Sequence, residues 1–292
     1  MKHVLDRRSF LTSLTAATLF QRLSAAEVGL RVASLDWALA ETMIALGQKP
    51  IAIVAAGDWD RFVVEPPLPS GVVDLGLQQE INFELLASLK PDLILTSPFL
   101  QDADPILEKI GATLKLSIFE KGTKPLAQPK ELMRILGERL GRAEAARNFL
   151  EKAEETFESH RSRIASLRPL PVLLVNFIDA RHVRVYGGAG LYQNVLDRIG
   201  VVNAWTGETN YWGYSTVGIE KLATTKNLRL IAFEPIQPDA RPTLDRSPLW
   251  SRLPFVKAGQ VSILPSVLMF GAMPSALRFA RLLVDHLEAV SK

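Results

Sequence analysis

The residues best suited to chemistry in this chain are aromatic, and they gather in one short window. All four tyrosines lie between positions 186 and 214, and Trp205 and Trp212 lie among them. The stretch 207–214 mixes polar and aromatic residues without helical or strand periodicity, so we predict a loop. Trp37 follows the first predicted strand, where α/β sheets contact ligands. Large rings on a loop between two elements suit a binding surface better than a core.

Residues that would support catalysis or direct metal binding are sparse. The chain has no cysteine, and after its first segment the histidines, His160, His182 and His286, lie far apart. The sequence lacks the phosphate-binding G-x-x-x-x-G-K-[ST], the zinc-binding H-E-x-x-H and the nucleophile motif G-x-S-x-G. We therefore assign no catalytic residue and no metal ligand, and we expect a binding protein without a resident cofactor.

The elements that must position these rings alternate between short apolar runs and amphipathic stretches. This alternation is typical of βαβ units and predicts mainly parallel strands covered by helices. In the first half we predict strands at 31–35, 50–55, 92–96 and 113–118, and helices at 39–46, 82–89, 106–110 and 129–140. In the second half we predict strands at 172–177, 183–186, 228–233 and 260–264, and helices at 191–199, 216–223 and 275–290.

A segment without glycine or proline, 142–168, separates the two halves. Ala146, Ala153 and Phe157 recur on one helical stripe, and charged residues cover the other faces. A helix of about 25 residues is roughly 37 Å long, enough to join two lobes, with packing on a single lobe as the alternative. We predict an α/β fold of two lobes, each with a mainly parallel sheet flanked by helices and joined by one long α-helix. The predicted boundaries are an N-terminal lobe at 27–141, the connecting helix at 142–168 and a C-terminal lobe at 169–292.

The first 26 residues have the layout of an export signal. Arg7 and Arg8 precede an apolar stretch that ends at a small-residue cleavage site, Ser24-Ala25-Ala26. The arginine pair resembles the twin-arginine type of signal, with a standard secretory signal as the alternative.

Removing the segment leaves equal numbers of basic and acidic residues, which argues against a nucleic-acid partner. No run approaches the ~20 apolar residues of a membrane span, so we predict a soluble periplasmic protein, cleaved near Ala26.

Segments spread over nearly all of the remaining chain match one known family. The first is RVASLDWALAETMIALG at 31–47, followed by 65–69, 74–77, 82–86 and 89–92. In the second half the matching segments are 178–182, 203–205, 207–213 and 254–259. Together they resemble the periplasmic binding proteins for iron-siderophores and cobalamin, and in particular the ferrichrome-type hydroxamate-siderophore binders of that family. The most specific piece is Gly-Glu-Thr-Asn-aromatic-Trp-Gly at 207–213.

The resemblance implies two α/β lobes with a shallow cleft that holds a ferric siderophore, of the hydroxamate type, for an inner-membrane ABC permease and its ATPase. Iron would arrive already wrapped by the siderophore, so the protein need not supply a metal ligand. Another bulky chelate, such as cobalamin, haem or a catecholate siderophore, is the alternative ligand. An enzyme that processes the ferric chelate is a third hypothesis. We expect a monomer.

The resemblance assigns some site residues by a direct match. Trp37 and Trp212 match cleft tryptophans of the family, and Asn210 and Tyr211 are candidate polar contacts beside Trp212. Gln78 stands where the hydroxamate binders have an arginine. A charge-assisted hydrogen bond contributes about 1.5–3 kcal/mol and a neutral one about 0.5–1.5 kcal/mol, so this change affects which siderophore is preferred.

Other site positions depart from the family pattern. The expected cleft tyrosine falls near Phe99 or Leu100, where there is no phenol. A tryptophan expected in the last cleft loop falls at Leu268, close to Phe270. These four apolar side chains are therefore candidate ligand contacts.

The resemblance also implies that one acidic residue on each lobe contacts arginines of the permease. On the second lobe the matching position is Glu220, in the helix predicted after Ser215. On the first lobe Asp104 or Glu108 could serve.

Overall fold

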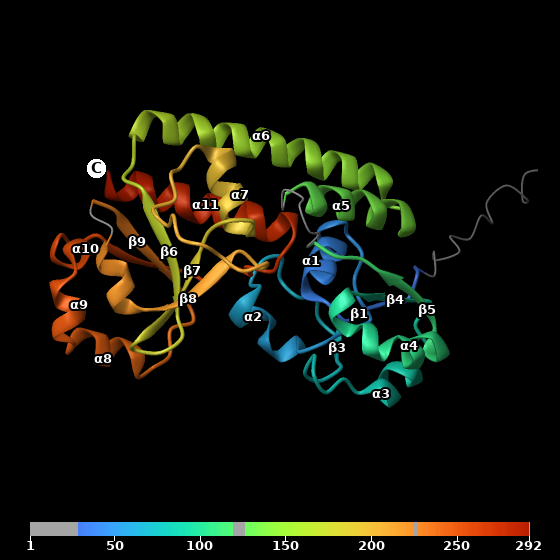
Figure 1. Cartoon of the computed structure of the whole chain (residues 1–292). Coiled ribbons are helices and arrows are strands. Elements are labelled where there is room, and N and C mark those ends of the chain that lie inside the picture. The colour runs from blue at the N-terminus through green and yellow to red at the C-terminus, as the bar shows by residue number, and fades with distance from the viewer. Residues whose placement is uncertain (1–28, 119–125, 225–226, 292) are drawn as a thin grey trace, which may run out of the picture. The chain divides into compact units, whose positions relative to one another are not determined.

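The computed structural model describes residues 29–118, 126–224 and 227–291 (Figure 1). The predicted export signal at 1–26 lies outside these residues. From Arg31 onward the described residues form one compact unit with two five-stranded sheets. The predicted α/β fold of two lobes, joined by a long helix, is confirmed.

The sheet of the first lobe is entirely parallel, with strand order β3-β2-β1-β4-β5. The central strand β1 is buried along its whole length, as expected when helices cover both faces of a parallel sheet. The strands are β1 Val32–Ser34, β2 Ala52–Ile53, β3 Val73–Asp74, β4 Leu93–Thr96 and β5 Ala112–Lys115. The helices are α1 Trp37–Ala45, α2 Trp59–Phe62, α3 Phe83–Ser88, α4 Asp104–Ile110 and α5 Ala127–Arg139, with 3-10 turns at Ala56–Asp58 and Pro98–Ala103.

The sheet of the second lobe is mixed, with strand order β10-β9-β6-β7-β8. β10, β9 and β6 pair in parallel, whereas β7 runs antiparallel to both of its neighbours, β6 and β8, and is the strand of this sheet that departs from the predicted parallel pattern. The strands are β6 Val172–Phe177, β7 His182–Tyr186, β8 Tyr214–Gly218, β9 Arg229–Phe233 and β10 Val261–Leu264. The helices are α7 Leu191–Ile199, α8 Ala240–Asp245, α9 Pro248–Arg252, α10 Pro254–Lys257 and α11 Met273–Val290, with a 3-10 turn at Ile219–Thr224.

The predicted helix at 216–223 is wrong. Its first half belongs to β8, which pairs with β7 from Tyr186 opposite Tyr214 to His182 opposite Gly218. Tyrosine, threonine and valine in this stretch favour a pleated strand, and the antiparallel neighbour supplies the backbone hydrogen bonds. Only the 3-10 turn at Ile219–Thr224 remains of the predicted helix.

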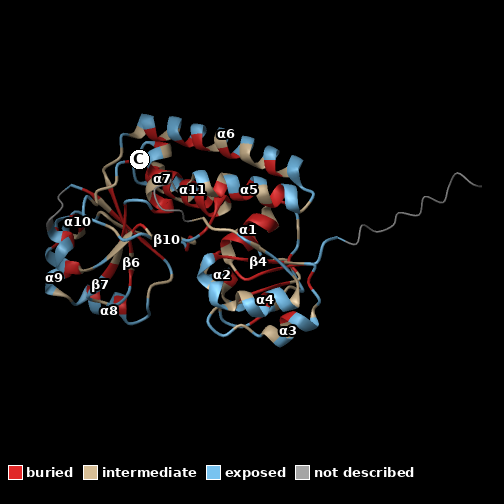
Figure 2. Cartoon of the chain, turned by 45° about the vertical axis from the view of Figure 1, so that its right-hand side comes forward, coloured by how far each residue is buried: buried red, intermediate tan, exposed pale blue. Residues whose placement is uncertain are grey.

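The long helix α6 Ala143–Leu167 contacts both lobes rather than one. It packs against α5 of the first lobe and against α7 and α11 of the second. Figure 2 shows exposed residues along its outer side and buried residues on the side that faces these helices. The buried stripe contains Ala146, Ala153, Phe157 and Ile164, and also His160. A stiff helix therefore connects the two sheets.

A second connection joins the lobes after β10. The Ser266 hydroxyl donates a hydrogen bond to the carbonyl of Phe62 at 3.2 Å, and Leu268 packs against the apolar cluster around Trp59. α11 then begins beside α1 and runs back along α6 (Figure 1). The chain therefore returns to the first lobe before it ends on the second.

One continuous apolar cluster fills the junction of the lobes. It includes Met43 of α1, Leu136 of α5, Phe157 of α6, Leu196 of α7 and Phe279 of α11, each at most 1% exposed. Complete burial of one such side chain contributes about 1.5–3 kcal/mol. The lobes thus share a core, and this core fixes how their edges face each other.

A buried carboxyl group lies at the same junction. Oε1 of Glu41, in α1, accepts hydrogen bonds from the backbone N–H groups of Ala272 at 2.5 Å and Ser275 at 3.4 Å. Its Oε2 accepts a hydrogen bond from the Ser275 hydroxyl at 2.6 Å. These groups form the N-terminus of α11, so Glu41 caps that helix from the other lobe. Burial disfavours the charged carboxylate and raises the pKa of Glu41 to about 8, because these hydrogen bonds oppose the effect only in part.

We expect the free energy of unfolding to fall between pH 5 and pH 8, because Glu41 keeps its proton in the folded chain over this range but ionises in the unfolded chain. The pKa is higher in the folded than in the unfolded chain, so the folded chain binds more protons over this window. Raising the pH from 5 to 8 therefore destabilises the folded chain by on the order of 3 kcal/mol through Glu41 alone. Glu41→Gln removes the ionisation, so urea titrations at the two pH values should show a correspondingly smaller fall.

Glu151→Gln is the matched control, because Glu151 is exposed on α6. This variant should keep the pH dependence of the wild type. The same fall in Glu41→Gln as in the wild type would contradict a raised pKa at Glu41.

Candidate binding cleft

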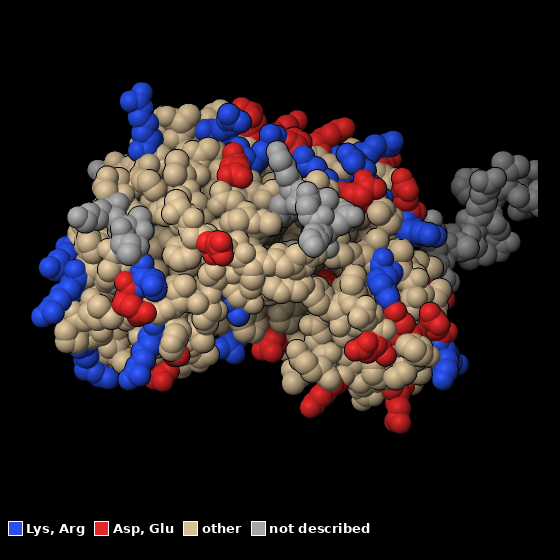
Figure 3. Space-filling view, viewed as in Figure 1, with Lys and Arg blue, Asp and Glu red and all other residues tan. Residues whose placement is uncertain are grey.

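A cavity of about 670 Å³ opens where the two lobes meet, and Figure 3 shows the surface hollowed there, at the lower edge of the view. We call this cavity the Trp212 cleft. Apart from Trp212 and Phe270, its lining comes from the first lobe: Asp36, Gln78, Gln79, Ile81, Phe83, Phe99, Leu100, Asp102, Ala103 and Ile106. Its size is in the range of small-molecule sites, and its lining is mostly apolar with a few polar groups.

The sheet of the first lobe explains where most of this lining comes from. Asp36 follows β1, Gln78 follows β3 and Phe99 follows β4. Because the strands are parallel, their carboxyl ends meet at one edge of the sheet, which is where α/β folds place ligand contacts. Residues far apart in sequence are thereby brought to one rim.

The structure brings together most of the predicted site residues. Gln78, Phe99, Leu100, Trp212 and Phe270 line the Trp212 cleft. Trp37 and Leu268 line a smaller cavity of about 280 Å³, which shares Asp36, Gln78, Gln79 and Phe270 with the cleft. Asn210 and Tyr211 line neither cavity. The two cavities are therefore neighbouring parts of one region.

Aromatic rings meet across the Trp212 cleft. The centroid of the Trp212 ring lies 4.7 Å from that of Phe99, on the first lobe. It lies 6.0 Å from that of Phe270, with the rings at 87°, and 4.8 Å from that of Tyr211. These distances are typical of edge-to-face and tilted pairs, which add about 0.5–1.5 kcal/mol to the burial of the rings. Trp212 is thus the point at which the second lobe contacts the first within the cleft.

Trp37 has a structural contact as well as a position in the smaller cavity. Its indole N–H donates a hydrogen bond to the carbonyl of Val54 at 2.8 Å. Its ring lies 6.0 Å from that of Phe62 and 6.3 Å from that of Trp59. These contacts hold the half-buried indole at the cavity wall.

The side chain of Asn210 orders the loop that carries Trp212. Its Oδ1 accepts hydrogen bonds from the backbone N–H groups of Trp212 at 3.0 Å and Tyr214 at 3.3 Å. Gly213 has φ +78°, and a Cβ there would lie 2.2 Å from the Cα of Gly190, so only glycine fits. Asn210 was predicted as a polar ligand contact, and the structure instead directs its oxygen to its own loop.

Asp36 was not predicted, although it lines both cavities. Its Oδ1 accepts hydrogen bonds from the backbone N–H groups of Ala38 at 2.9 Å and Leu39 at 3.2 Å, so it caps α1. Burial raises the pKa of Asp36, and the hydrogen bonds from the backbone N–H groups of Leu39 and Ala38 oppose this only in part. Its place between a strand and a helix was the available sequence signal.

Six other lining residues were missed, namely Gln79, Ile81, Phe83, Asp102, Ala103 and Ile106. They occupy turns and helix starts beyond the ends of β3 and β4. Phe83 lies in the family-like segment 82–86, but nothing in the sequence marked any of the six as a ligand contact.

Among the described residues, no group of three or more histidine, cysteine, aspartate or glutamate side chains is placed to hold a metal ion. In the same part of the chain, no helix combines the length and apolar character needed to cross a membrane.

Comparison with known proteins gives a consistent set of relatives. The profile of the periplasmic binding protein family matches residues 32–268. The chain is 33% identical over 284 residues to the iron(3+)-hydroxamate-binding protein FhuD of Escherichia coli (strain K12), and the alignment covers 96% of each protein.

Solved structures show the same fold. The crystal structure of the siderophore binding protein FhuD from Vibrio cholerae, bound to Fe³⁺–Desferal, is similar with a TM-score of 0.83 and 27% identity over 90% of this chain and 99% of that one. FhuD2 from Staphylococcus aureus with bound ferrioxamine B has a TM-score of 0.72 and 18% identity over 90% of this chain and 100% of that one. At 18% identity the second likeness concerns the fold alone.

We expect Asn210→Ala to lower the free energy of unfolding by about 1–2 kcal/mol, because two backbone N–H groups lose their acceptor. Asn210→Asp keeps an oxygen in place and should lose much less. Urea unfolding measures the stability, and acrylamide quenching of tryptophan fluorescence, with Trp212→Phe as reference, measures the exposure of Trp212. Equal stability of the alanine and aspartate variants would exclude the loop-ordering role.

Proposed function

The chain belongs to the periplasmic binding protein family, and from that premise we propose that it captures a ferric siderophore of the hydroxamate type and delivers it to an inner-membrane ABC importer. One observation carries the proposal: rings from both lobes converge on the Trp212 cleft, at a site large enough for a bulky organic ligand. The relationship to a named hydroxamate binder along almost the whole chain supports the ligand class.

The chemistry of the lining suits a prewrapped metal. A hydroxamate siderophore surrounds Fe³⁺ with its own oxygens, so the protein must hold an apolar shell with a polar face. Each ~100 Å² of apolar contact contributes about 2.5 kcal/mol before costs, and three rings with one or two hydrogen bonds leave about −8 kcal/mol, or roughly micromolar binding. Gln78 offers a neutral amide for the polar face.

Three further parts of the proposal follow from this chemistry. Iron enters only as the ferric siderophore, the protein has no resident cofactor, and it releases its ligand without a chemical step. The protein acts as an exported monomer in the periplasm, and its partners there are the ferric siderophore and the permease with its ATPase.

We place the permease contacts on acidic residues outside the cleft. Glu108 on α4 and Glu220 in the 3-10 turn after β8 are both exposed. Asp104 is half-buried and forms an ion pair with Lys115. A carboxylate that already has a partner is less available to an arginine of the permease, which favours Glu108 over Asp104 on the first lobe.

Ferric desferrioxamine B should quench the tryptophan fluorescence of the protein, and Trp212→Ala should raise its Kd about tenfold to a hundredfold. The expected loss is the burial of one aromatic face, about 1.5–3 kcal/mol. Fluorescence titration and isothermal calorimetry measure the change.

Trp250→Phe is the control, because Trp250 is only 7% exposed and packs against Phe177 and Phe255 in the core of the second lobe. It should bind as the wild type does. Unchanged affinity in Trp212→Ala would remove Trp212 from the site.

Glu220→Arg should leave siderophore affinity unchanged and reduce uptake of radiolabelled ferric siderophore by about tenfold, because the reversed charge repels an arginine at the docking surface. Uptake is measured in cells that carry the cognate importer and the variant as their only binding protein. Glu155→Arg, on the exposed side of α6, is the control and should transport normally. Normal uptake with Glu220→Arg would exclude Glu220 from docking.

A further inference from the structure

Both charged residues that line the two cavities are acidic. They are Asp36 and Asp102, and neither cavity has a lysine or arginine in its described lining. A ligand that enters this region therefore meets carboxyl groups, neutral amides and rings, but no cation. The charge of the ligand is thus a property that the cleft can distinguish.

Asp102 is the acid that remains available. Its side chain is exposed at the rim of the cleft and has no hydrogen-bond or ion-pair partner within the described part of the chain. Asp36, in contrast, is committed to the N-terminus of α1. Asp104, two residues along the chain, is paired with Lys115. Asp102 is therefore placed to receive a cation from outside the chain.

The rings beside Asp102 favour the same kind of ligand. Phe99, Trp212 and Phe270 all line the cleft that Asp102 lines. The face of an aromatic ring carries partial negative charge, so it attracts an ammonium group and does not attract a carboxylate. The rings and the Asp102 carboxylate therefore both favour a ligand with a positively charged group.

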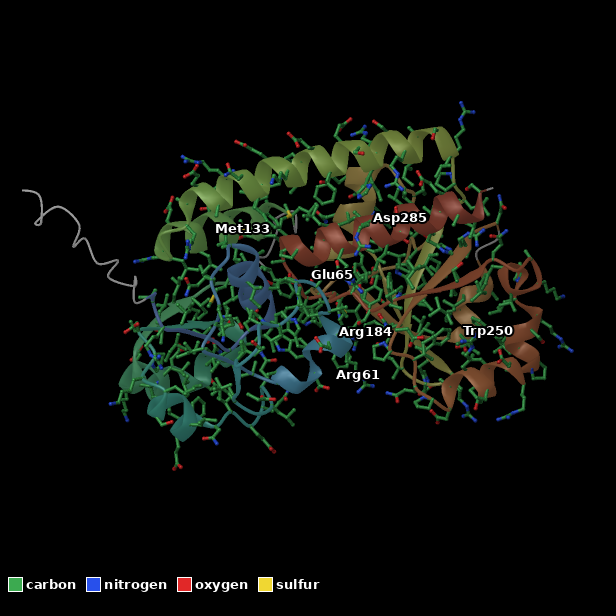
Figure 4. The ribbon with its side chains drawn as sticks, turned by 180° about the vertical axis from the view of Figure 1, so that it is seen from behind. Arg61, Glu65, Met133, Arg184, Trp250 and Asp285 are labelled. Atoms are coloured by element: carbon green, nitrogen blue, oxygen red, sulfur yellow. The ribbon has the colours of Figure 1, made fainter. Side chains whose placement is uncertain are left out.

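Two arginines of neighbouring elements lie outside the lining of both cavities. Arg61 of α2 and Arg184 of β7 are labelled in Figure 4. The guanidinium of Arg61 lies 5.1 Å from the centroid of the Phe62 ring, and that of Arg184 lies 4.4 Å from the centroid of the Tyr214 ring. Nη1 of Arg184 also contacts the sulfur of Met269 at 3.7 Å. Both arginines already have contacts, and neither lines a cavity.

We infer that the Trp212 cleft selects ferric hydroxamates that carry a positively charged amine at their edge, and that Asp102 with the adjacent rings is the determinant of this selection. The inference rests on the proposed function and adds a charge class to its ligand. Neutral chelates of the same shape bind more weakly, and chelates with a carboxylate at that edge bind most weakly.

Three ferric chelates of one scaffold test this order. Desferrioxamine B carries a free ammonium group, its N-acetyl derivative is neutral there, and its N-succinyl derivative carries a carboxylate. Calorimetric Kd values for the full-length mature protein should increase in that order, with a preference of about fivefold for the ammonium form over the acetyl form at low salt. Raising the ionic strength should reduce the preference.

Asp102→Asn should bring the ammonium and acetyl forms to nearly equal Kd while leaving the Kd of the acetyl form unchanged. Glu84→Gln removes one acidic charge from an exposed position of α3 in the same lobe, outside the lining of both cavities, and it should keep the wild-type preference. Circular dichroism and thermal unfolding show whether the variants fold like the wild type.

The outcomes separate the inference from the function. Equal binding of the three chelates by the wild type, or an unchanged preference in Asp102→Asn, would overturn the inference and leave the proposed function intact. Binding of none of the three would overturn the proposed function, and the inference with it.

Discussion

The shared apolar core between the lobes is the interaction on which the cleft depends. α6 and α11 lie side by side across the junction and bury Phe157 and Phe279 in one cluster with Met43 of the first lobe. Because this core is closely packed, the lobes cannot slide or separate without exposing it to water. The distance between Phe99 and Trp212, which belong to different lobes, is therefore set by packing remote from both rings.

Polar contacts add orientation to this apolar junction. Glu65 of the first lobe accepts hydrogen bonds from Arg278 at 2.5 Å and Arg281 at 2.8 Å, and Figure 4 shows Glu65 beside the first turns of α11. Glu41 caps the same helix from α1. A cap and an ion pair have directional geometry, whereas apolar burial has none. They fix the position of α11 against the first lobe, and with it the segment before α11 that carries Phe270.

The sequence predicted those features that depend on local pattern. The charged and apolar faces of α6 gave its extent. The helix predicted at 82–89 is present as α3, and the Oδ1 of Asn82 caps it, 2.8 Å from the nitrogen of Leu85. β8 was missed because its pairing partner β7 precedes it by nearly thirty residues and a local pattern cannot show that pairing. The sequence did not show that Asp102 lines the cleft, for a related reason. Its role arises from Trp212, which the fold brings from the other lobe.

The loop that presents Trp212 explains why the aromatic lining can give useful affinity. A ring on an unsupported loop loses part of its burial energy to ordering of the loop. Here the backbone around Trp212 is held by Asn210, by Gly213 packed against Gly190 and by the start of β8. The fold itself orders the indole before a ligand binds. The free energy gained by burying its face is therefore not spent on ordering the loop and adds to the affinity for the ligand. The same rigidity limits adaptation, and a rim that cannot rearrange distinguishes ligands by the charge at their edge as well as by their shape.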